Sequence, residues 1–326
     1  MAGNRNAGVD AVRILGIVAI VAGHVWMTPV MRELVFPWHV PVFFFLSGYL
    51  WKSGRGLREE ISRRTSTLLK PYAFWLIALY VPWSIALFIF DEATPAKLWE
   101  PLYGGRGVGG PFNTFWFVFA LFATAVIWRM LSTTPIAVRV GCTVVGALLG
   151  TLFGPQLAST PLALGNALPA LVFLAAGQLA RHLPIERTGA RILTSVTALV
   201  VSGALVASGL SLPVNIKSGD WGTPVLSYLV AILISWALVI LAETWARNLI
   251  PRVSAAISYA ALTGFTVVLV HSTVIWLGFE AGVPLPLLFA LALLIPVGVA
   301  LIALRTRFSQ WLTGVPRVTP RTAEQR

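Results

Sequence analysis

The sequence predicts an all-α integral membrane protein, a bundle of about ten transmembrane helices with both termini in the cytoplasm. Hydrophobic residues make up 57% of the 326 positions and charged residues only 11%, whereas a soluble domain carries about 25% charged residues. The mean hydropathy is +0.82, and 13 Trp with 18 Phe are typical of the aromatic belts at membrane surfaces. The net charge of +12 does not indicate nucleic-acid binding, because the basic residues stand at the ends of apolar runs.

Ten apolar runs follow one another along the chain, most of them near the roughly 20 residues that a spanning helix needs. The second run is short, which fits a tilted, re-entrant or internally packed segment. We expect a single membrane domain over residues 1–326, with 305–326 as a cytoplasmic tail. The single cysteine, Cys142, excludes an intrachain disulfide and a cysteine-ligated zinc site, and no metal is expected. The candidate spans are Ala11–Met31, Trp38–Lys52, Leu68–Phe90, Asn113–Ser132, Pro135–Gly154, Leu164–His182, Ile192–Leu210, Val225–Glu243, Ala255–Phe279 and Leu285–Leu304.

The distribution of basic residues predicts the orientation, because Lys and Arg collect on the cytoplasmic side of membrane proteins. With ten spans and the N-terminus inside, nineteen of the 24 Lys and Arg residues fall on the cytoplasmic side. Four fall on the outer side, namely Arg32, Lys97, Arg106 and Lys217, and Arg13 lies within the first span. A missed or additional helix would destroy this asymmetry. The sequence therefore predicts a multi-pass protein of the cell membrane with both termini cytoplasmic.

The richest cytoplasmic segment is Ser53–Lys70, in which apolar residues recur at near-helical spacing among arginines. It is predicted to form an amphipathic helix on the inner leaflet, where anionic lipids attract basic residues. A second interpretation is a phosphate-binding ledge made by Arg63, Arg64 and Lys70, because Arg and Lys are the usual phosphate ligands. Both interpretations stay open from the sequence alone.

Ionisable side chains within the first span are functional candidates, because they are costly inside a bilayer. Asp10 and Arg13 are three positions apart and can pair on one helix face. Arg13 and His24 are eleven positions apart, which is about three turns, or about 16 Å, along one face. One stripe of the helix then carries a cation near the cytoplasm and an imidazole in the outer half. The structural alternative is that Arg13 extends to the inner interface and His24 is a packing residue.

Two further histidines are expected at a similar depth, His39 at the outer end of the second span and His271 in the outer half of the ninth. Either one alone is more often structural than catalytic. Three histidines in the outer half of one bundle favour a site. Ser47 and Gly48 in the second span allow close helix approach, or else wall a groove for an extended ligand.

The pattern Asp10-x-x-Arg13, followed after ten residues by His24, resembles the acyltransferase-3 family of integral membrane O-acyltransferases. Four later parts of the chain extend the resemblance in the family's order, so it covers nearly the whole membrane core. Ten helices with both ends inside is also the family's layout. The four parts are Phe36–Tyr49, Arg63-Arg64 with Leu68–Tyr72, Asn113–Phe117, and Ser258–His271.

The resemblance implies transfer of an acyl group, usually acetyl, from cytoplasmic acyl-CoA to a hydroxyl of a carbohydrate, glycolipid or other lipid-linked acceptor. It implies that His24 is the catalytic residue and that Arg13 is required beside it. It leaves the identity of the acceptor open.

Acyl transfer to a hydroxyl needs a base for the hydroxyl proton and hydrogen-bond donors for the oxyanion. The ordinary pKa of histidine, about 6.5, suits His24 to the first task. We expect Arg13 and the ledge of Arg63, Arg64 and Lys70 to hold the donor phosphates, with the pantetheine arm along the first-helix stripe. The acceptor would then meet the thioester at the level of the three histidines.

Ser47, Asn113 and Trp116 are the candidates for oxyanion donors and, with His39 and His271, for acceptor contacts. The competing function is a multipass transporter or lipid flippase, because intramembrane Arg and His in helices broken by Gly and Pro also suit a transporter. The hydropathy shows no inverted repeat, and the basic ledge flanks one end only. These two observations favour the enzyme.

Overall fold

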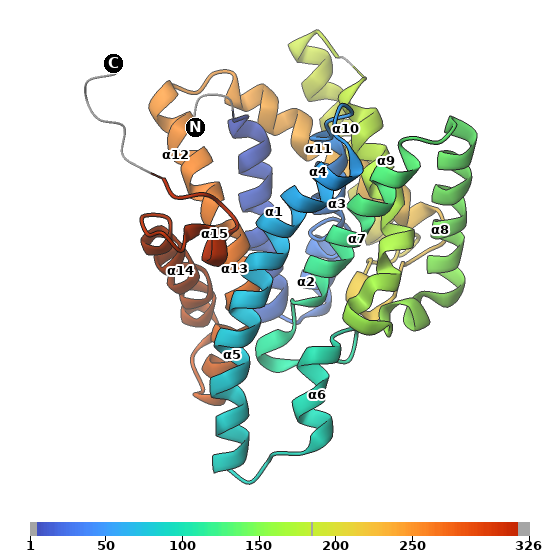
Figure 1. The fold of residues 1–326 in the computed structure, drawn as a ribbon. Coiled ribbons are helices and arrows are strands. Elements are labelled where there is room, and N and C mark those ends of the chain that lie inside the picture. The colour runs from blue at the N-terminus through green and yellow to red at the C-terminus, as the bar shows by residue number, and fades with distance from the viewer. Residues whose placement is uncertain (1–4, 184, 319–326) are drawn as a thin grey trace.

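The computed structural model describes residues 5–183 and 185–318, which form a helical bundle with no strand beyond one isolated bridge (Figure 1). Nine helices within these ranges are long and apolar enough to cross a membrane. The α-helices are α1 (Ala7–Val25), α2 (Pro29–Val35), α3 (Pro41–Tyr49), α4 (Leu57–Arg64), α5 (Lys70–Ile89), α6 (Pro95–Tyr103), α7 (Trp116–Leu131), α8 (Ile136–Ala158), α9 (Ala167–Arg181), α10 (Thr188–Ala207), α11 (Leu226–Ala246), α12 (Pro251–Ala260), α13 (Gly264–Glu280), α14 (Leu285–Ala303) and α15 (Ser309–Thr313). The short 3₁₀ or π segments are η1 (Thr65–Leu69), η2 (Gly110–Phe112), η3 (Pro161–Asn166), η4 (Ile216–Ser218) and η5 (Ala261–Thr263).

The second of the ten expected spans is much shorter than predicted. Residues 36–40 form turns, and Pro41 begins a helix of only nine residues, α3. Pro fits the first helical turn because it lacks the N–H that would be unsatisfied there. α3 packs inside the bundle against α9, so the internally packed alternative is confirmed.

Two glycines permit this packing. A Cβ on Gly48 of α3 would collide with the Leu174 carbonyl of α9, and a Cβ on Gly177 would collide with the Phe45 carbonyl of α3. The two backbones therefore touch at a distance that only glycine allows, as small residues at a membrane helix interface do. The expectation of close helix approach at Gly48 is confirmed.

The basic segment before the third span is helical, as predicted, but it is not a separate helix. α4 continues through the π-helical turn η1 into α5, and together they make one helix of 33 residues, Leu57–Ile89. Such a helix is about 50 Å long, whereas the hydrocarbon core of a bilayer is about 30 Å thick. The additional turns place the arginines of α4 beyond the apolar part of the helix.

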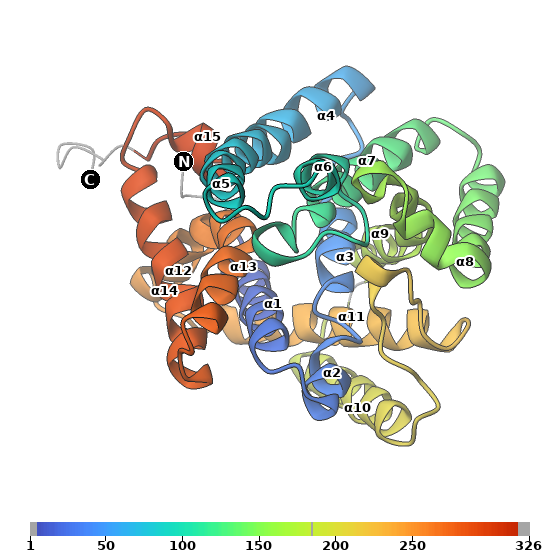
Figure 2. The ribbon, with the colours of Figure 1, turned by 90° about the horizontal axis from the view of Figure 1, so that it is seen from below.

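α1 lies at the centre of the helices that form the site. It packs against α11, α13, α14 and α3, and Figure 2 shows it between α13 on one side and α3 on the other. Its N-terminus is capped by the Asn6 side chain, which accepts from the Gly8 N–H at 2.9 Å. His24 therefore stands in the last turn of a helix that is enclosed by neighbours. Which side of the bundle faces the cytoplasm stays a prediction from the basic residues.

Candidate active site

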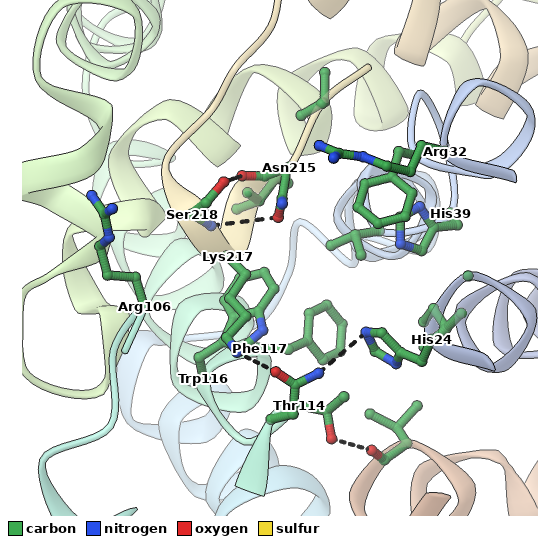
Figure 3. A pocket seen from close by; sticks show the side chains of 18 of the residues that line it. His24, Arg32, His39, Arg106, Thr114, Trp116, Phe117, Asn215, Lys217 and Ser218 are labelled. Carbon is green, nitrogen blue, oxygen red and sulfur yellow. Dashed lines mark hydrogen bonds between the residues drawn. The ribbon is translucent and has the colours of Figure 1, made fainter. Parts of the chain in front are cut away.

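A cavity of about 400 Å³ opens where α1 ends, and His24 stands in its wall (Figure 3). This volume is within the range of small-molecule sites. Five parts of the chain build the wall: the end of α1, the stretch from α2 to α3, the segment that leads into α7, the loop around η4, and Val268 of α13. Its polar lining residues are His24, Arg32, His39, Arg106, Asn113, Thr114, Trp116, Asn215, Lys217 and Ser218.

His24 is hydrogen-bonded to His271 of α13, with His24 Nδ1 and His271 Nε2 2.9 Å apart. The ring centroids are 5.2 Å apart and the ring planes differ by 13°, so the rings meet edge to edge and the bond lies close to both planes. His271 is fully buried, whereas His24 is in part open to the cavity. The sequence placed the two histidines at one depth, and the structure brings them into contact.

A carbonyl oxygen fixes the proton positions in this pair. His271 Nδ1 lies 2.7 Å from the Val267 carbonyl oxygen, which only accepts, so a neutral His271 carries its proton on Nδ1. Its Nε2 then accepts, and His24 must donate from Nδ1. The remaining nitrogen of His24, Nε2, then carries no proton and can accept a hydrogen bond.

The contacts of Lys217 and Asn113, at the other nitrogen of His24, give the same proton positions. Lys217 Nζ donates to Asn113 Oδ1 and, at 2.5 Å, to the Val108 carbonyl. A lysine ammonium only donates, so the oxygen end of the Asn113 amide must face it. The Nδ2 end then faces His24 Nε2 at 3.4 Å, which makes that nitrogen an acceptor. Both ends of the chain of contacts leave His24 Nε2 unprotonated and directed toward the cavity.

The segments that carry these side chains are held firmly. The Asn166 amide donates to the Ile216 carbonyl at 2.9 Å, next to Lys217, and a Cβ on Gly219 would collide with the Gly154 backbone of α8. Thr114, the neighbour of Asn113, donates to the Val268 carbonyl of α13 at 2.7 Å. The loop around η4 and the start of α7 are thereby fixed to the same frame as the histidines.

His39 and Trp116, two of the residues predicted to contact the acceptor, also line the cavity. His39 lies where the chain returns toward α3, and its Nδ1 is 2.8 Å from the Val35 carbonyl. Its Nε2 is therefore an acceptor in the neutral ring. Trp116 stands in the first turn of α7, beside Asn113.

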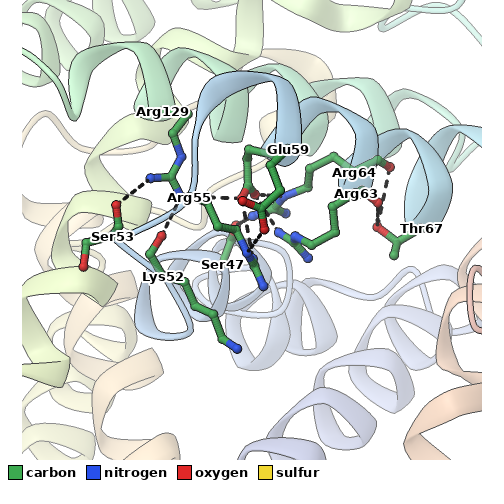
Figure 4. A network of polar contacts seen from close by, with 10 residues as sticks. Ser47, Lys52, Ser53, Arg55, Glu59, Arg63, Arg64, Thr67 and Arg129 are labelled. Atoms are coloured by element: carbon green, nitrogen blue, oxygen red, sulfur yellow. Dashed lines mark hydrogen bonds and ion pairs between the residues drawn. The ribbon is translucent and has the colours of Figure 1, made fainter.

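Ser47 is not in this cavity. Its hydroxyl accepts a hydrogen bond at 2.7 Å from Arg64, in a polar network around the buried Glu60 (Figure 4). The interpretation of Ser47 as a contact of the acceptor therefore has no support from its position. Four arginines surround the Glu60 carboxylate: Arg63 at 2.6 Å, Arg64 at 2.8 Å, Arg129 at 3.5 Å and Arg55 at 3.6 Å.

The predicted phosphate ledge is thus in part committed to internal contacts. Arg64 is buried and bonded to Glu60 and Ser47, whereas Arg63 is 37% exposed. Lys70 stands over the ring of Trp311, 5.5 Å from its centroid. Four arginines around one carboxylate leave a positive surplus, so Arg63 and its neighbours keep the charge that a phosphate would need.

Arg13 pairs with Asp10 at 2.8 Å, as predicted, and Arg5 binds the same carboxylate at 2.7 Å. The deepest α1 residue of the cavity wall is Ile20, one turn before His24. Arg13 does not line the cavity, so the structure separates the cation and the imidazole of the predicted stripe. Within the described residues no three His, Cys, Asp or Glu side chains group as a metal site would.

Sequence reasoning did not select Lys217, Arg32 and Arg106 as site residues, although all three line the cavity. The sequence nevertheless held a signal for these residues. They are three of the four basic residues that the predicted topology places on the outer side, whereas Lys and Arg generally collect on the cytoplasmic side. Exceptions to that bias are informative when they converge on one cavity.

Fold and site together define a multi-pass membrane protein with a hydrogen-bonded histidine pair beside a polar cavity. The sequence profile of the acyltransferase-3 family, described as an acyltransferase domain, matches residues 6–305, and the chain belongs to this family. Over 147 residues the chain is 28% identical to the nodulation protein NolL of Sinorhizobium fredii (strain NBRC 101917 / NGR234). That alignment covers 40% of this chain and 38% of that protein. No solved structure matches the chain.

Proposed function

We propose that the protein transfers an acyl group, acetyl in the first instance, from cytoplasmic acyl-CoA to a hydroxyl of a carbohydrate or glycolipid acceptor at the cell membrane. The observation that carries this proposal is the unprotonated His24 Nε2 beside the cavity, which accepts a long hydrogen bond of 3.4 Å from Asn113. The contacts on both sides of His24 place the proton of its neutral ring on Nδ1 and leave Nε2 unprotonated. A neutral imidazole nitrogen in this position is suited to act as a general base.

In the proposed reaction the acceptor hydroxyl gives its proton to His24 Nε2 while its oxygen attacks the thioester carbonyl. A C–O bond forms, and the tetrahedral intermediate then expels the CoA thiolate as the C–S bond breaks. The imidazolium returns the proton to that thiolate, which leaves an ester and free CoA. His271 Nε2 accepts from His24 Nδ1 throughout and so stabilises the imidazolium.

Asn113 Nδ2 and the indole N–H of Trp116 are the proposed oxyanion donors, because both residues line the cavity and Asn113 is in reach of His24. Arg13, Arg63, Arg64 and Lys70 remain the proposed holders of the donor phosphates, with Arg63 the most accessible arginine of the Glu60 network. For the donor arm to reach His24, the packing between Ile20 and the cytoplasmic end has to open.

The test uses purified protein in nanodiscs, labelled acetyl-CoA and an extract of the host's envelope glycolipids, with products identified by mass spectrometry. We expect acetyl transfer in the wild type and a loss of about 10²–10⁴-fold in His24→Ala. His182→Ala is the matched control, because His182 is exposed at the end of α9 and lies outside the cavity. Transport of an acceptor along a gradient without acyl transfer would instead support the transporter. Full activity in His24→Ala would remove the proposed base.

A further inference from the structure

The charge around the cavity has one sign. Arg32, Arg106 and Lys217 are among its lining residues, and among the described residues that line it there is no Asp or Glu. The fourth basic residue of the outer side, Lys97, lies elsewhere and pairs with Glu92 at 3.0 Å. Three cations on a half-enclosed surface set up a positive potential that attracts anions.

Lys217 is built into this wall rather than free on the surface. Two of its three N–H groups are used by Asn113 and Val108, so one donor remains for a ligand. Its loop is fixed by Asn166 and by the contact of Gly219 with α8. The partly buried ammonium is therefore held at the cavity at a cost that a bound anion would offset.

The two arginines stand at the rim. Arg32 and Arg106 are exposed, and Figure 3 shows them on opposite sides of Asn215 and Ser218. Within the described residues neither forms an ion pair, although Arg32 stands over the Phe36 ring at 5.6 Å from its centroid. The planar guanidinium can bind a phosphate or carboxylate with two parallel hydrogen bonds.

We propose that the acceptor carries an anionic group, a phosphate or a carboxylate attached to its sugar, which Arg32, Arg106 and Lys217 bind while its hydroxyl faces His24. This inference rests on the proposed function of the cavity as the acceptor site. The aromatic lining, Phe36, Trp116 and Phe117, supplies apolar faces for the sugar ring. The donor phosphates are assigned to the other end of α1, so they do not account for these three cations.

The test measures binding, which does not depend on catalysis. Protein in nanodiscs of neutral phosphatidylcholine is titrated calorimetrically with methyl glucoside, methyl glucuronide and glucose 1-phosphate, and farnesyl-phosphoglucose is embedded in the nanodiscs in a fourth arm. We expect each anionic probe to bind at least about tenfold more tightly than methyl glucoside, with affinity falling as salt is added. A preference for farnesyl-phosphoglucose over glucose 1-phosphate would assign the phosphate to a lipid-linked sugar, and the reverse to a free one.

Variants test whether the cations of the cavity, rather than the overall surface charge, bind the anionic probes. Arg32→Gln and Arg106→Gln should each weaken the anionic probes by about three- to tenfold and leave methyl glucoside unchanged. Lys97→Gln is the matched control and should change nothing, because Lys97 lies outside the cavity. Arg32→Lys keeps the charge but loses the planar fork, so its affinity for the anionic probes should lie between those of Arg32→Gln and the wild type. Size-exclusion profiles confirm that each variant is folded.

Two results would overturn the inference. One is equal affinity for charged and uncharged probes, and the other is displacement of the anionic probes by free CoA, which would make the cations part of the donor site. Acetyl transfer to uncharged sugars at full rate would keep the proposed function and reject the anionic acceptor. Tight anion binding without any acetyl transfer would keep the binding site and reject the proposed function.

Discussion

His24 and His271 are 247 positions apart in the chain, yet a hydrogen bond of 2.9 Å joins their rings close to one plane. Because the Val267 carbonyl fixes the proton of His271, the bond has one direction in the neutral pair. In the proposed mechanism His271 is thus a positioning residue. It touches the proposed base, His24, and does not line the cavity.

His271→Ala should lower kcat by about 10-fold to 100-fold and leave KM for the acceptor nearly unchanged, because the base loses its orientation while the cavity keeps its lining. His271→Gln should recover part of kcat, since the side-chain oxygen of Gln can accept from His24 Nδ1. Steady-state kinetics of the two variants give this comparison. A change in KM alone, or no rescue by Gln, would make His271 a packing residue.

Activity should fall as the pH rises above about 8, because burial lowers the pKa of Lys217 from 10.5 to about 8. Below that pH the ammonium is charged and binds the acceptor; above it the amine is neutral and the attraction is lost. The carboxylate of Glu100 opposes this shift in part, because it raises the pKa of Lys217. In Lys217→Arg the guanidinium stays charged, so the alkaline decline should disappear from the pH–rate profile. An unchanged decline in that variant would exclude Lys217 as its source.

Arg13→Ala should weaken acyl-CoA binding while the protein still folds, if Arg13 holds the donor phosphates or orders the groups that do. Arg13→Lys keeps the charge but loses the planar fork, so its donor affinity should lie between those of Ala and the wild type. Equilibrium binding of labelled acetyl-CoA measures this series. Unchanged affinity in Arg13→Ala would limit Arg13 to its ion pair with Asp10.

Glu60→Gln should destabilise the fold, because it leaves the buried Arg64 and Arg129 without their carboxylate. Removing one partner of a buried ionic network typically costs about 3–5 kcal/mol of the free energy of unfolding. Glu59→Gln is the matched control, since Glu59 is 62% exposed and, among the residues that the structure describes, forms its one ion pair with Arg55, at 3.4 Å. Thermal unfolding midpoints in one detergent compare them. Equal midpoints would show that the network adds nothing to stability.

Much of the fold was predictable from the chain, because length and hydropathy decide which segments cross a bilayer. Nine of the ten expected spans are helices long enough to do so. The short α3 depends on reciprocal contacts at Gly48 and Gly177, which are distant in sequence, so hydropathy could suggest internal packing but not its partner. The continuity of α4 with α5 depends on the π-helical turn at 65–69, for which apolar spacing gives no signal.

The site was predicted in part for a similar reason. Depth along a helix places His24, His39 and His271 at one level, but only the helix packing brings His271 into contact with His24. Ser47 lies outside the cavity and instead accepts a hydrogen bond from Arg64, a contact between residues 17 positions apart that helical spacing does not indicate. Lys217 comes from a loop, where no periodicity indicates direction, and it reaches the site only because Asn166 and Gly154 hold that loop.

The cavity draws its side chains from two kinds of segment. The histidine pair stands on the enclosed helices α1 and α13, whereas Arg32, Arg106 and Lys217 come from α2 and from connecting loops. Connecting segments tolerate substitution and change of length better than packed helices do. Because backbone contacts hold the loop around η4 in place, we expect a new acceptor preference to come from single substitutions at Arg32, Arg106 or Lys217, which leave those contacts and the histidine pair unchanged.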